Sequence, residues 1–408
     1  MRAARVGAAL VLSVTLACNA DPATSPADGG ISPPTSGTAV MQVVGHGVLT
    51  DRFTAEVWAR PPFAYTTTWG RRGQAQTAGN AINIWNVSSN TPVLVDSVIV
   101  GPGVTTIGDV EVSDDGSLLV VPTEFAPGSI RVFDLSNPRK PVLRSTYTSA
   151  AITQGVHTCE IERVNGRLYA FLAINRGPAL PSSLEIVDLT DPTNPTRVFG
   201  RAMGIPFIHD VFVRDGILFT ALWNDGLVLW DIGGGGKGGS VSSPVEMGRI
   251  VTQNGEVHNV WWYHDGLSGD KRFVFVGEEG PGAIGASSIG DIHVVDISNP
   301  AAPVEVAFFN VPEAGTHNFS VDEAHGFLYA AYYNAGVQVL DVRGDLSACA
   351  SDAKVDGRCD LRKSGHFIAE GLRDQGTPVY VWGVHAVNGF VYASDMLNGL
   401  WKLRGYTR

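Results

Sequence analysis

The hydrophobic positions of the chain fall into many short segments, separated by turns rich in Gly, Pro, Asn and Asp. No long segment has apolar residues at helical spacing. Short apolar runs that are bounded by Gly and Pro are typical of strands joined by tight turns. The pattern therefore predicts an all-β protein.

One phrase recurs along the chain: an apolar strand that ends in Asp, a turn that contains Pro, and a second apolar strand. The clearest copies are IRVFDLSNPRKPV, LEIVDLTDPTNPT and IHVVDISNPAAPV. The acid, or Asn in its place, is found at Asn86, Asp134, Asp188, Asp231, Asp296 and Asp341, and the C-terminal copy GLWKLR lacks it. An Asp side chain accepts a hydrogen bond from the backbone two residues further on, and Pro presets φ, so the phrase predicts two strands around a tight turn.

A second phrase precedes most copies, and it consists of a Gly followed by apolar and aromatic residues, as in GRLYAFLA from Gly166 and GFLYAAYY from Gly326. A further strand precedes that Gly, so one unit contains four strands. Such units cannot bury both faces alone and pack face to face around an axis. Seven units predict a seven-bladed β-propeller of four-stranded antiparallel blades, closed by a strand at residues 41–45. Six or eight blades remain alternatives.

The segments LEIVDLTDPTNP and IHVVDISNPAAP resemble the signature of the LVIVD-repeat family, and the resemblance covers roughly residues 80–403. It implies a β-propeller that is commonly exported or displayed on a surface, and it implies no single activity. The first unit, residues 46–92, and the glycine run 233–239 depart from the pattern.

The N-terminal segment resembles the signal of a bacterial lipoprotein. Arg2 and Arg5 precede a short apolar run, which ends at Leu16-Ala17-Cys18. We expect a signal peptide at 1–18, lipidation of Cys18, a flexible linker at 19–40 and the propeller at 41–408. The expected location is the outer membrane or the cell surface, without a transmembrane helix in the mature protein. An ordinary secretory signal with an incidental cysteine is the alternative.

Charge and cysteine usage narrow the class of partner. A net charge of −11 argues against nucleic acid, which requires a basic surface. We expect a monomer that contacts a membrane only through its lipid and binds a protein, a glycan or a small molecule. Cys349 and Cys359 are predicted to form a disulfide in an oxidising compartment, and two reduced surface thiols are the alternative. Cys159 is left over, either as a buried inert thiol or as a ligand.

Four histidines, His157, His209, His258 and His317, open the same strand in four successive units. That strand is the innermost of a blade, so the imidazoles are predicted to surround one mouth of the central channel. Imidazoles that converge suit Zn, Cu or Fe. The alternative is structural, with each His bonded to the neighbouring blade's backbone. Asp109 and Glu56 are the candidates for this place in the second and first units.

The loops at 69–80, 174–183 and 277–290 are long, and they are expected on the same face as the histidines. Uneven loops on one face of a repeat protein commonly mark its binding face. The candidate ligand-binding residues on this face are Glu124, Asn175, Trp223, Glu278, Glu279, Tyr333, Asn334, His385 and Asp395. Ordinary solvated loop polarity is the alternative.

The sequence contains no nucleophile elbow, P-loop, His-Glu-x-x-His or Cys-x-x-Cys motif. Two functional hypotheses follow, a purely structural scaffold of the envelope is the remaining alternative, and no catalytic residue is assigned. The first is a binding or interaction module of the cell envelope. The second is a metal-dependent enzyme, an oxidoreductase or a hydrolase, with the four histidines as ligands and Glu124, Glu278 or Glu279 as a general base.

Overall fold

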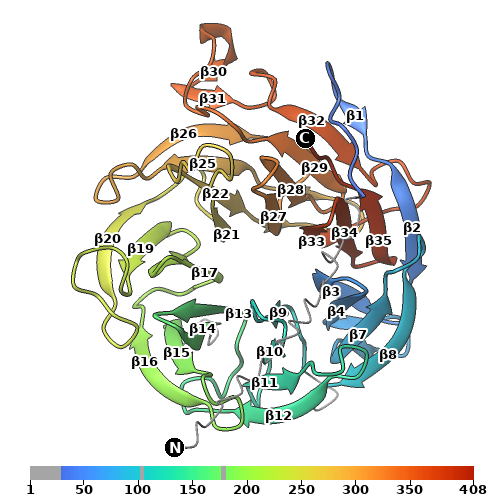
Figure 1. The fold of residues 1–408 in the computed structure, drawn as a ribbon, viewed down its shortest axis with the longest axis vertical. Helices are drawn as coiled ribbons and strands as arrows, with labels where there is room; N and C mark the ends of the chain where they lie inside the picture. Colours follow the sequence, from blue (N-terminus) through green and yellow to red (C-terminus); the bar gives the residue numbers. More distant parts are fainter. Residues whose placement is uncertain (1–28, 102–104, 176–180) are drawn as a thin grey trace, which may run out of the picture.

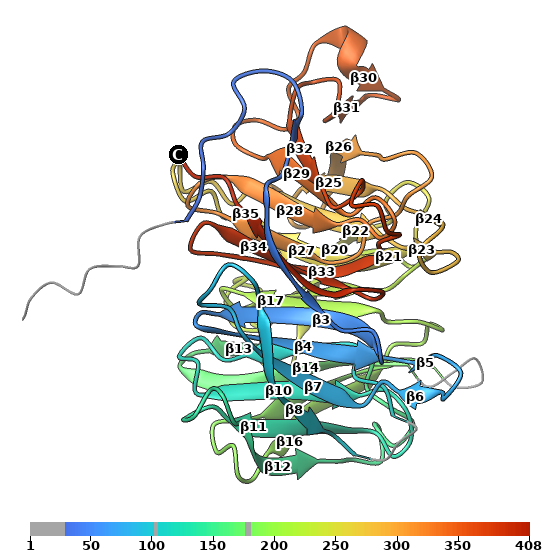
Figure 2. The ribbon, with the colours of Figure 1, turned by 90° about the vertical axis from the view of Figure 1, so that its right-hand side faces the viewer.

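A computed structural model describes residues 29–101, 105–175 and 181–408, and the part that it describes is almost entirely β-structure (Figure 1). The predicted signal peptide and Cys18 lie outside the described residues. Seven twisted sheets surround a central axis, so the predicted seven-bladed propeller is confirmed. Figure 2 shows the same ring from the side, with the blades stacked around it.

The first four blades follow one another along the chain, and each begins at the channel and ends at the rim. Blade 1 contains β3 (Phe53–Arg60), β4 (Phe63–Trp69), β7 (Ala81–Asn86) and β8 (Val93–Ile99). Blade 2 contains β9 (Glu111–Val112), β10 (Leu118–Thr123), β11 (Ser129–Asp134) and β12 (Val142–Tyr147). Blade 3 contains β13 (Thr158–Val164), β14 (Arg167–Ile174), β15 (Ser183–Asp188) and β16 (Thr196–Ala202). Blade 4 contains β17 (Asp210–Arg214), β18 (Ile217–Ala221), β19 (Leu227–Asp231) and β20 (Val245–Ile250).

The last three blades each recruit strands from elsewhere in the chain. Blade 5 contains β21 (Val257–Trp262), β22 (Phe273–Glu278), β25 (Ile292–Asp296) and β26 (Val304–Phe309), extended by β31 (Arg358–Asp360) and β30 (Lys354–Val355). Blade 6 contains β27 (Phe319–Asp322), β28 (Phe327–Ala331), β29 (Val337–Asp341) and β32 (Phe367–Gly371), with β1 (Ala39–Val40) at its edge. Blade 7 contains β33 (Val381–Val387), β34 (Phe390–Asp395) and β35 (Gly399–Arg404).

The N-terminal strand β2 (Val43–Val48) completes blade 7 by pairing antiparallel with β35. The ring is therefore closed by the expected segment, although the strand extends three residues beyond the expected 41–45. Two short hairpins stand on the loop-bearing face, β5 (Arg71–Arg72) with β6 (Thr77–Ala78), and β23 (Gly280–Pro281) with β24 (Ser288–Ile289).

The recurring Asp ends the third strand of a blade and holds the turn that follows. Asp134 Oδ1 accepts a hydrogen bond from the Ser136 backbone over 2.7 Å, and Asp296 Oδ1 accepts one from the Ser298 backbone over 2.8 Å. Each bond gives the turn backbone a hydrogen-bond partner at the point where pairing between the strands ends. The repeated sequence phrase is thus a repeated turn.

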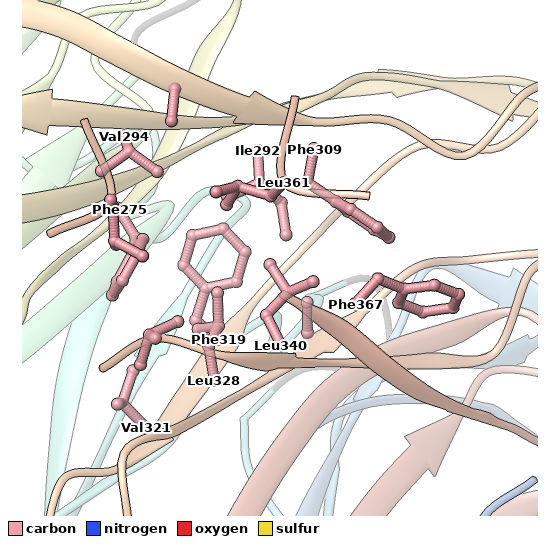
Figure 3. Packing of buried hydrophobic residues seen from close by; sticks show 14 of the residues in the cluster. Phe275, Ile292, Val294, Phe309, Phe319, Val321, Leu328, Leu340, Leu361 and Phe367 are labelled. Atoms are coloured by element: carbon pink, nitrogen blue, oxygen red, sulfur yellow. The ribbon is translucent and has the colours of Figure 1, made fainter. Parts of the chain in front are cut away.

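The hydrophobic core lies between blades and not inside a single sheet. Figure 3 shows the interface of blades 5 and 6, where Phe275 and Phe309 on one side face Phe319, Leu328 and Leu340 on the other. Corresponding clusters fill the other interfaces, because each sheet buries both faces against its neighbours. Packing of this kind leaves the inner ends of the strands to line a channel.

The predicted disulfide joins Cys349 and Cys359. It anchors an insertion that contains a 3₁₀ turn, η1 (Ser351–Ala353), and that adds β31 parallel to β26 at the rim of blade 5. The bond is consistent with an extracytoplasmic location. In the described ranges, no helix has the length and apolarity that crossing a membrane requires.

Candidate metal centre

Four successive blades bring a histidine to the same mouth of the channel. The backbone N–H groups of His157, His209 and His317 donate to the carbonyl oxygen near the end of the second strand in their own blades, over 2.8–2.9 Å. His258 lies at the corresponding start of β21. Because the four residues share one position at the head of the innermost strand, their side chains converge.

The imidazoles form a continuous arc. The ring centroids of His157 and His209 are 4.3 Å apart, those of His209 and His258 are 3.9 Å apart, and those of His258 and His317 are 4.2 Å apart. His258 is only 1 % exposed. Trp382 of blade 7 continues the arc, with its ring 4.3 Å from that of His317.

Glu279, at the end of the second strand of blade 5, faces this arc. Its Oε2 lies 3.4 Å from His209 Nε2 and 3.7 Å from His258 Nε2, and its Oε1 lies 3.9 Å from His317 Nε2. The buried hydroxyl of Tyr333 donates a hydrogen bond to Glu279 Oε1. One ligand atom each from His209, His258 and Glu279 lies within 4.8 Å of the others.

Hydrogen bonds fix the orientation of the two outer imidazoles. His317 Nδ1 donates to the backbone carbonyl oxygen of Trp382 over 2.7 Å, and His157 Nδ1 lies 2.7 Å from Glu124 Oε1. A carbonyl and a carboxylate only accept, so each Nδ1 carries the hydrogen and the Nε2 atoms face inward. His157 Nε2 also hydrogen-bonds His209 Nε2 over 2.9 Å.

The pKa values of three of the imidazoles are lowered, and two of the three rings have at least one nitrogen that lacks a hydrogen-bond partner. Burial lowers the pKa of His209, His258 and His317 well below its usual value, and the neighbouring imidazoles lower it further. His157 differs, because burial lowers its pKa but the charge and hydrogen bond of Glu124 outweigh burial and raise it. Neither ring nitrogen of His258 has a hydrogen-bond partner, nor has His209 Nδ1. Buried polar atoms without partners are costly, which points to a partner that the protein alone does not supply.

The arc opens into a cavity of about 590 Å³, which continues down the channel. Its upper wall is aromatic, and the Trp223 ring lies nearly parallel to that of His209 at 5.6 Å. The other aromatic residues of this wall are Trp69, Phe207, Tyr380 and Trp382. The hairpin β23–β24 adds Pro281, Gly282 and Ile284 at the entrance. A volume of this size suits a small organic molecule.

Only some of the residues that were predicted for the ligand-binding face line the cavity. Glu124, Trp223, Glu279 and Tyr333 line the cavity beside the imidazoles. His385 also lines it, but its ring packs against Trp58, with ring centroids 4.8 Å apart.

The remaining predicted residues make structural hydrogen bonds away from the cavity lining. Glu278 accepts from the Asp291 backbone and lies 3.4 Å from His293 Nε2. Asn175 Oδ1 accepts from the Ile208 backbone. Asn334 Oδ1 accepts from Ser288 Oγ, and Asp395 Oδ1 accepts from the backbone of Tyr380.

Asp109 and Cys159 are hydrogen-bonded to each other beneath the arc. Asp109 Oδ2 accepts from the Cys159 backbone over 2.8 Å, and Glu56 accepts from the Asn318 side chain. Cys159 is buried, and burial raises the pKa of its thiol well above its usual value. A thiol that stays protonated is a poor metal ligand.

Trp382 is the residue of this site that sequence reasoning missed. In the four histidine units, the His precedes the glycine or Asp-Gly of the following turn by seven to nine residues. Trp382 precedes Gly389 by seven, whereas His385 precedes it by four. The same spacing rule therefore identifies Trp382, and not His385, as the counterpart in blade 7.

Comparison with known proteins agrees with the repeat. The family model for the LVIVD repeat matches residues 286–311, which contain the third and fourth strands of blade 5 with the Asp296 turn between them. No curated protein matches the chain. The chain is a seven-bladed β-propeller that carries the LVIVD repeat.

Proposed function

We propose that this protein is a metal-binding module of the cell envelope, and that its ligand is a transition-metal ion at the mouth of the channel. The ion is held by His209, His258 and Glu279, and Nε2 of His317, 3.9 Å from Glu279 Oε1, is the fourth ligand. His157 lies beside this set and hydrogen-bonds His209. The observation that carries the proposal is that His209, His258 and Glu279 each bring a ligand atom within 4.8 Å of the others, while both ring nitrogens of the buried His258 lack a hydrogen-bond partner.

The distances suit a first-row ion. Ligand atoms about 2.0–2.1 Å from a tetrahedral ion lie roughly 3.3–3.4 Å from each other. The carboxylate–imidazole distances of 3.4, 3.7 and 3.9 Å are close to that separation. Imidazole nitrogen favours Zn, Cu, Fe or Ni, whereas Ca²⁺ and Mg²⁺ prefer oxygen alone.

The groups behind the ligands support the same function. The Trp382 carbonyl orients His317, and the Tyr333 hydroxyl orients Glu279. Such outer partners fix a ligand's tautomer and rotation before the metal arrives. A buried histidine with a purely structural role would have its ring nitrogens hydrogen-bonded, whereas His258 leaves both unpartnered.

A metal-dependent enzyme, oxidative or hydrolytic, is the second candidate function. The observation that favours it is the aromatic cavity that opens beside the imidazoles, because a catalytic metal needs an open position and room for substrate. Glu124 is then the general base that remains available. Glu279 is a metal ligand in this proposal, and Glu278 lies outside the cavity.

The location proposed is the outer surface of a membrane, with lipid on Cys18 and residues 19–40 as the tether. The disulfide supports an oxidising compartment. The loop-rich mouth would then face away from the membrane and be open to a protein, a glycan or a small molecule. Fractionation of cells that express the native chain and Cys18→Ser tests the anchor, since only the native chain should partition with membranes.

Elemental analysis of the purified protein tests the metal. We expect one transition-metal ion per chain in the native protein and in His325→Ala, which alters a histidine paired with Asp322 away from the site. We expect loss of the ion in His258→Ala and His317→Ala. Failure of the native protein to bind Zn²⁺, Cu²⁺, Fe²⁺ or Ni²⁺ after direct titration would refute the proposal.

A further inference from the structure

Below the imidazole arc, the same cavity is lined by carboxylates from four blades. Asp109 and Glu111 come from the beginning of blade 2, Glu160 from β13, Asp210 from β17 and Glu56 from β3. Asp109 and Glu111 are two residues apart, so extended backbone places them about 7 Å apart along the channel. The carboxylates therefore occupy more than one level of the channel.

Within the described part of the chain no ion pair neutralises these carboxylates, although His157 acts electrostatically on Asp109 and Asp210, and Arg214 on Glu160. Among the described residues that line the cavity there is no Lys or Arg. Burial and the neighbouring carboxylates raise the pKa of Glu56 to about 8, and they raise the pKa of Glu111 well above its usual value. His385 does not compensate, because burial lowers its pKa to about 4. Without a cation these carboxyl groups therefore tend to hold their protons, and a bound cation would stabilise their ionised forms.

Among the described residues, the channel carboxylates do not bring three oxygens together as the ligands of one bare ion would be. Within the described residues, the three-ligand group compact enough to hold an ion consists of His209, His258 and Glu279. The channel carboxylates do not form a second such group. Charges that are spread along a channel match a cation whose own charges are spread along its length.

The surfaces between the carboxylates are apolar. Trp58, Phe212 and Trp261 line this part of the cavity and offer ring faces and edges. Aromatic faces attract ammonium groups and pack against methylene chains. Asn259 also lines the cavity, is 3 % exposed, and has a side-chain oxygen without a hydrogen-bond partner. That oxygen is a further acceptor for an N–H group.

We propose that the channel binds a linear aliphatic diamine or polyamine. One ammonium group lies among Asp109, Asp210 and Glu56, the next lies between Glu111 and Glu160, and the methylene chain between them packs on the aromatic side chains. A four-carbon spacer separates two ammonium groups by about the distance between the carboxylate levels. The site lies below the imidazole arc, and it does not require the metal ion.

Calorimetric titration with 1,4-diaminobutane tests this inference on metal-free and on Zn²⁺-treated protein. We expect saturable binding in both samples, weakened by salt, and none for the neutral isostere 1,4-butanediol. The double variant Glu111→Gln, Glu160→Gln should bind at least about tenfold more weakly, because charge-assisted hydrogen bonds are lost. Glu162→Gln, on the same strand but outside the cavity lining, should bind as the native protein does.

Stability separates a binding role from a structural one. Removing two uncompensated buried carboxylates should raise the melting temperature of the ligand-free protein, whereas loss of a structural role would lower it. The inference is overturned if butanediol binds as tightly as the diamine, if Mg²⁺ at the same concentration stabilises the protein equally, or if the double variant keeps full affinity. Metal uptake without diamine binding contradicts this inference alone, and diamine binding without metal uptake contradicts the metal proposal alone.

Discussion

His317 Nδ1 donates a hydrogen bond to the backbone carbonyl oxygen of Trp382 across the junction of blades 6 and 7, over 2.7 Å. The bond fixes the imidazole with its Nε2 facing Glu279. The neighbouring blade therefore supplies the orientation, while His317 supplies the nitrogen. Function at this mouth depends on how blades pack against each other as well as on which residues they carry.

Tyr333→Phe should weaken metal binding without unfolding the protein. The Tyr333 hydroxyl donates to Glu279, so its loss leaves the carboxylate freer to rotate. Loss of an outer partner typically costs about 10–100-fold in metal affinity. Competition with a chromogenic chelator measures the change. Tyr332→Phe is the matched control, since that buried hydroxyl bonds the backbone of Gly290 instead, and equal affinities in the two variants would contradict the assigned role.

Chelation should lower the thermal stability of the native protein reversibly. A ligand that binds only the folded state stabilises it by about 2.7 kcal/mol at a concentration one hundred times its dissociation constant. Differential scanning calorimetry with added Zn²⁺ and then with EDTA measures this shift. His258→Ala should show no shift under either condition. A shift that persists in this variant would place the stabilising ion elsewhere.

The stability of blade 5 should depend on pH through His293. Burial alone would lower the pKa of His293, but hydrogen bonds and charges from Glu278 and Glu305 raise it from 6.5 to about 9. The folded state holds this proton more tightly than the unfolded chain, so the stabilisation is complete below pH 6.5 and is lost as the pH rises through about 9. Each pKa unit corresponds to about 1.4 kcal/mol, which gives a contribution of about 3 kcal/mol.

Urea unfolding of the native protein and of His293→Gln measures that contribution. The gap between their free energies of unfolding should be largest near pH 6 and should shrink toward zero above pH 9. His325→Gln, at a more exposed His–Asp pair, controls for the loss of a surface imidazole. A gap that stays constant over the whole range would show that His293 acts by packing alone.

The architecture could be predicted from the repeat, because most units show their strand order through the same Asp turn and the same Gly. The convergence of His157, His209, His258 and His317 followed from register alone, since equal positions in equal units meet at the axis. The sequence could not distinguish Glu279 from Glu278. Adjacent side chains at the end of a strand point to opposite sides, and the sequence does not show which side faces the channel. Trp382 could have been found from its spacing to Gly389, and Asp109 and Glu56 were predicted from the corresponding places in their units. The gathering of Glu111, Glu160 and Asp210 in one channel depends on contacts between blades, which no single unit encodes.

The last prediction concerns ring closure by β2, the strand near the N-terminus that pairs with the C-terminal strand β35. Gly47 of β2 lies against blade 1, and a Cβ there would meet the Trp85 ring at 2.6 Å and the Pro92 carbonyl oxygen at 2.9 Å. Gly47→Ala should therefore push β2 away from β35 and destabilise the protein by about 1–3 kcal/mol. Val48→Ala, at an exposed side chain of the same strand, should have little effect. Limited proteolysis locates the damage: cleavage near β2 should precede cleavage in blades 2–4, because opening the last blade exposes its edge before the remaining interfaces separate. Simultaneous cleavage throughout the ring would mean that the blades unfold as one unit and that β2 is not the weak point.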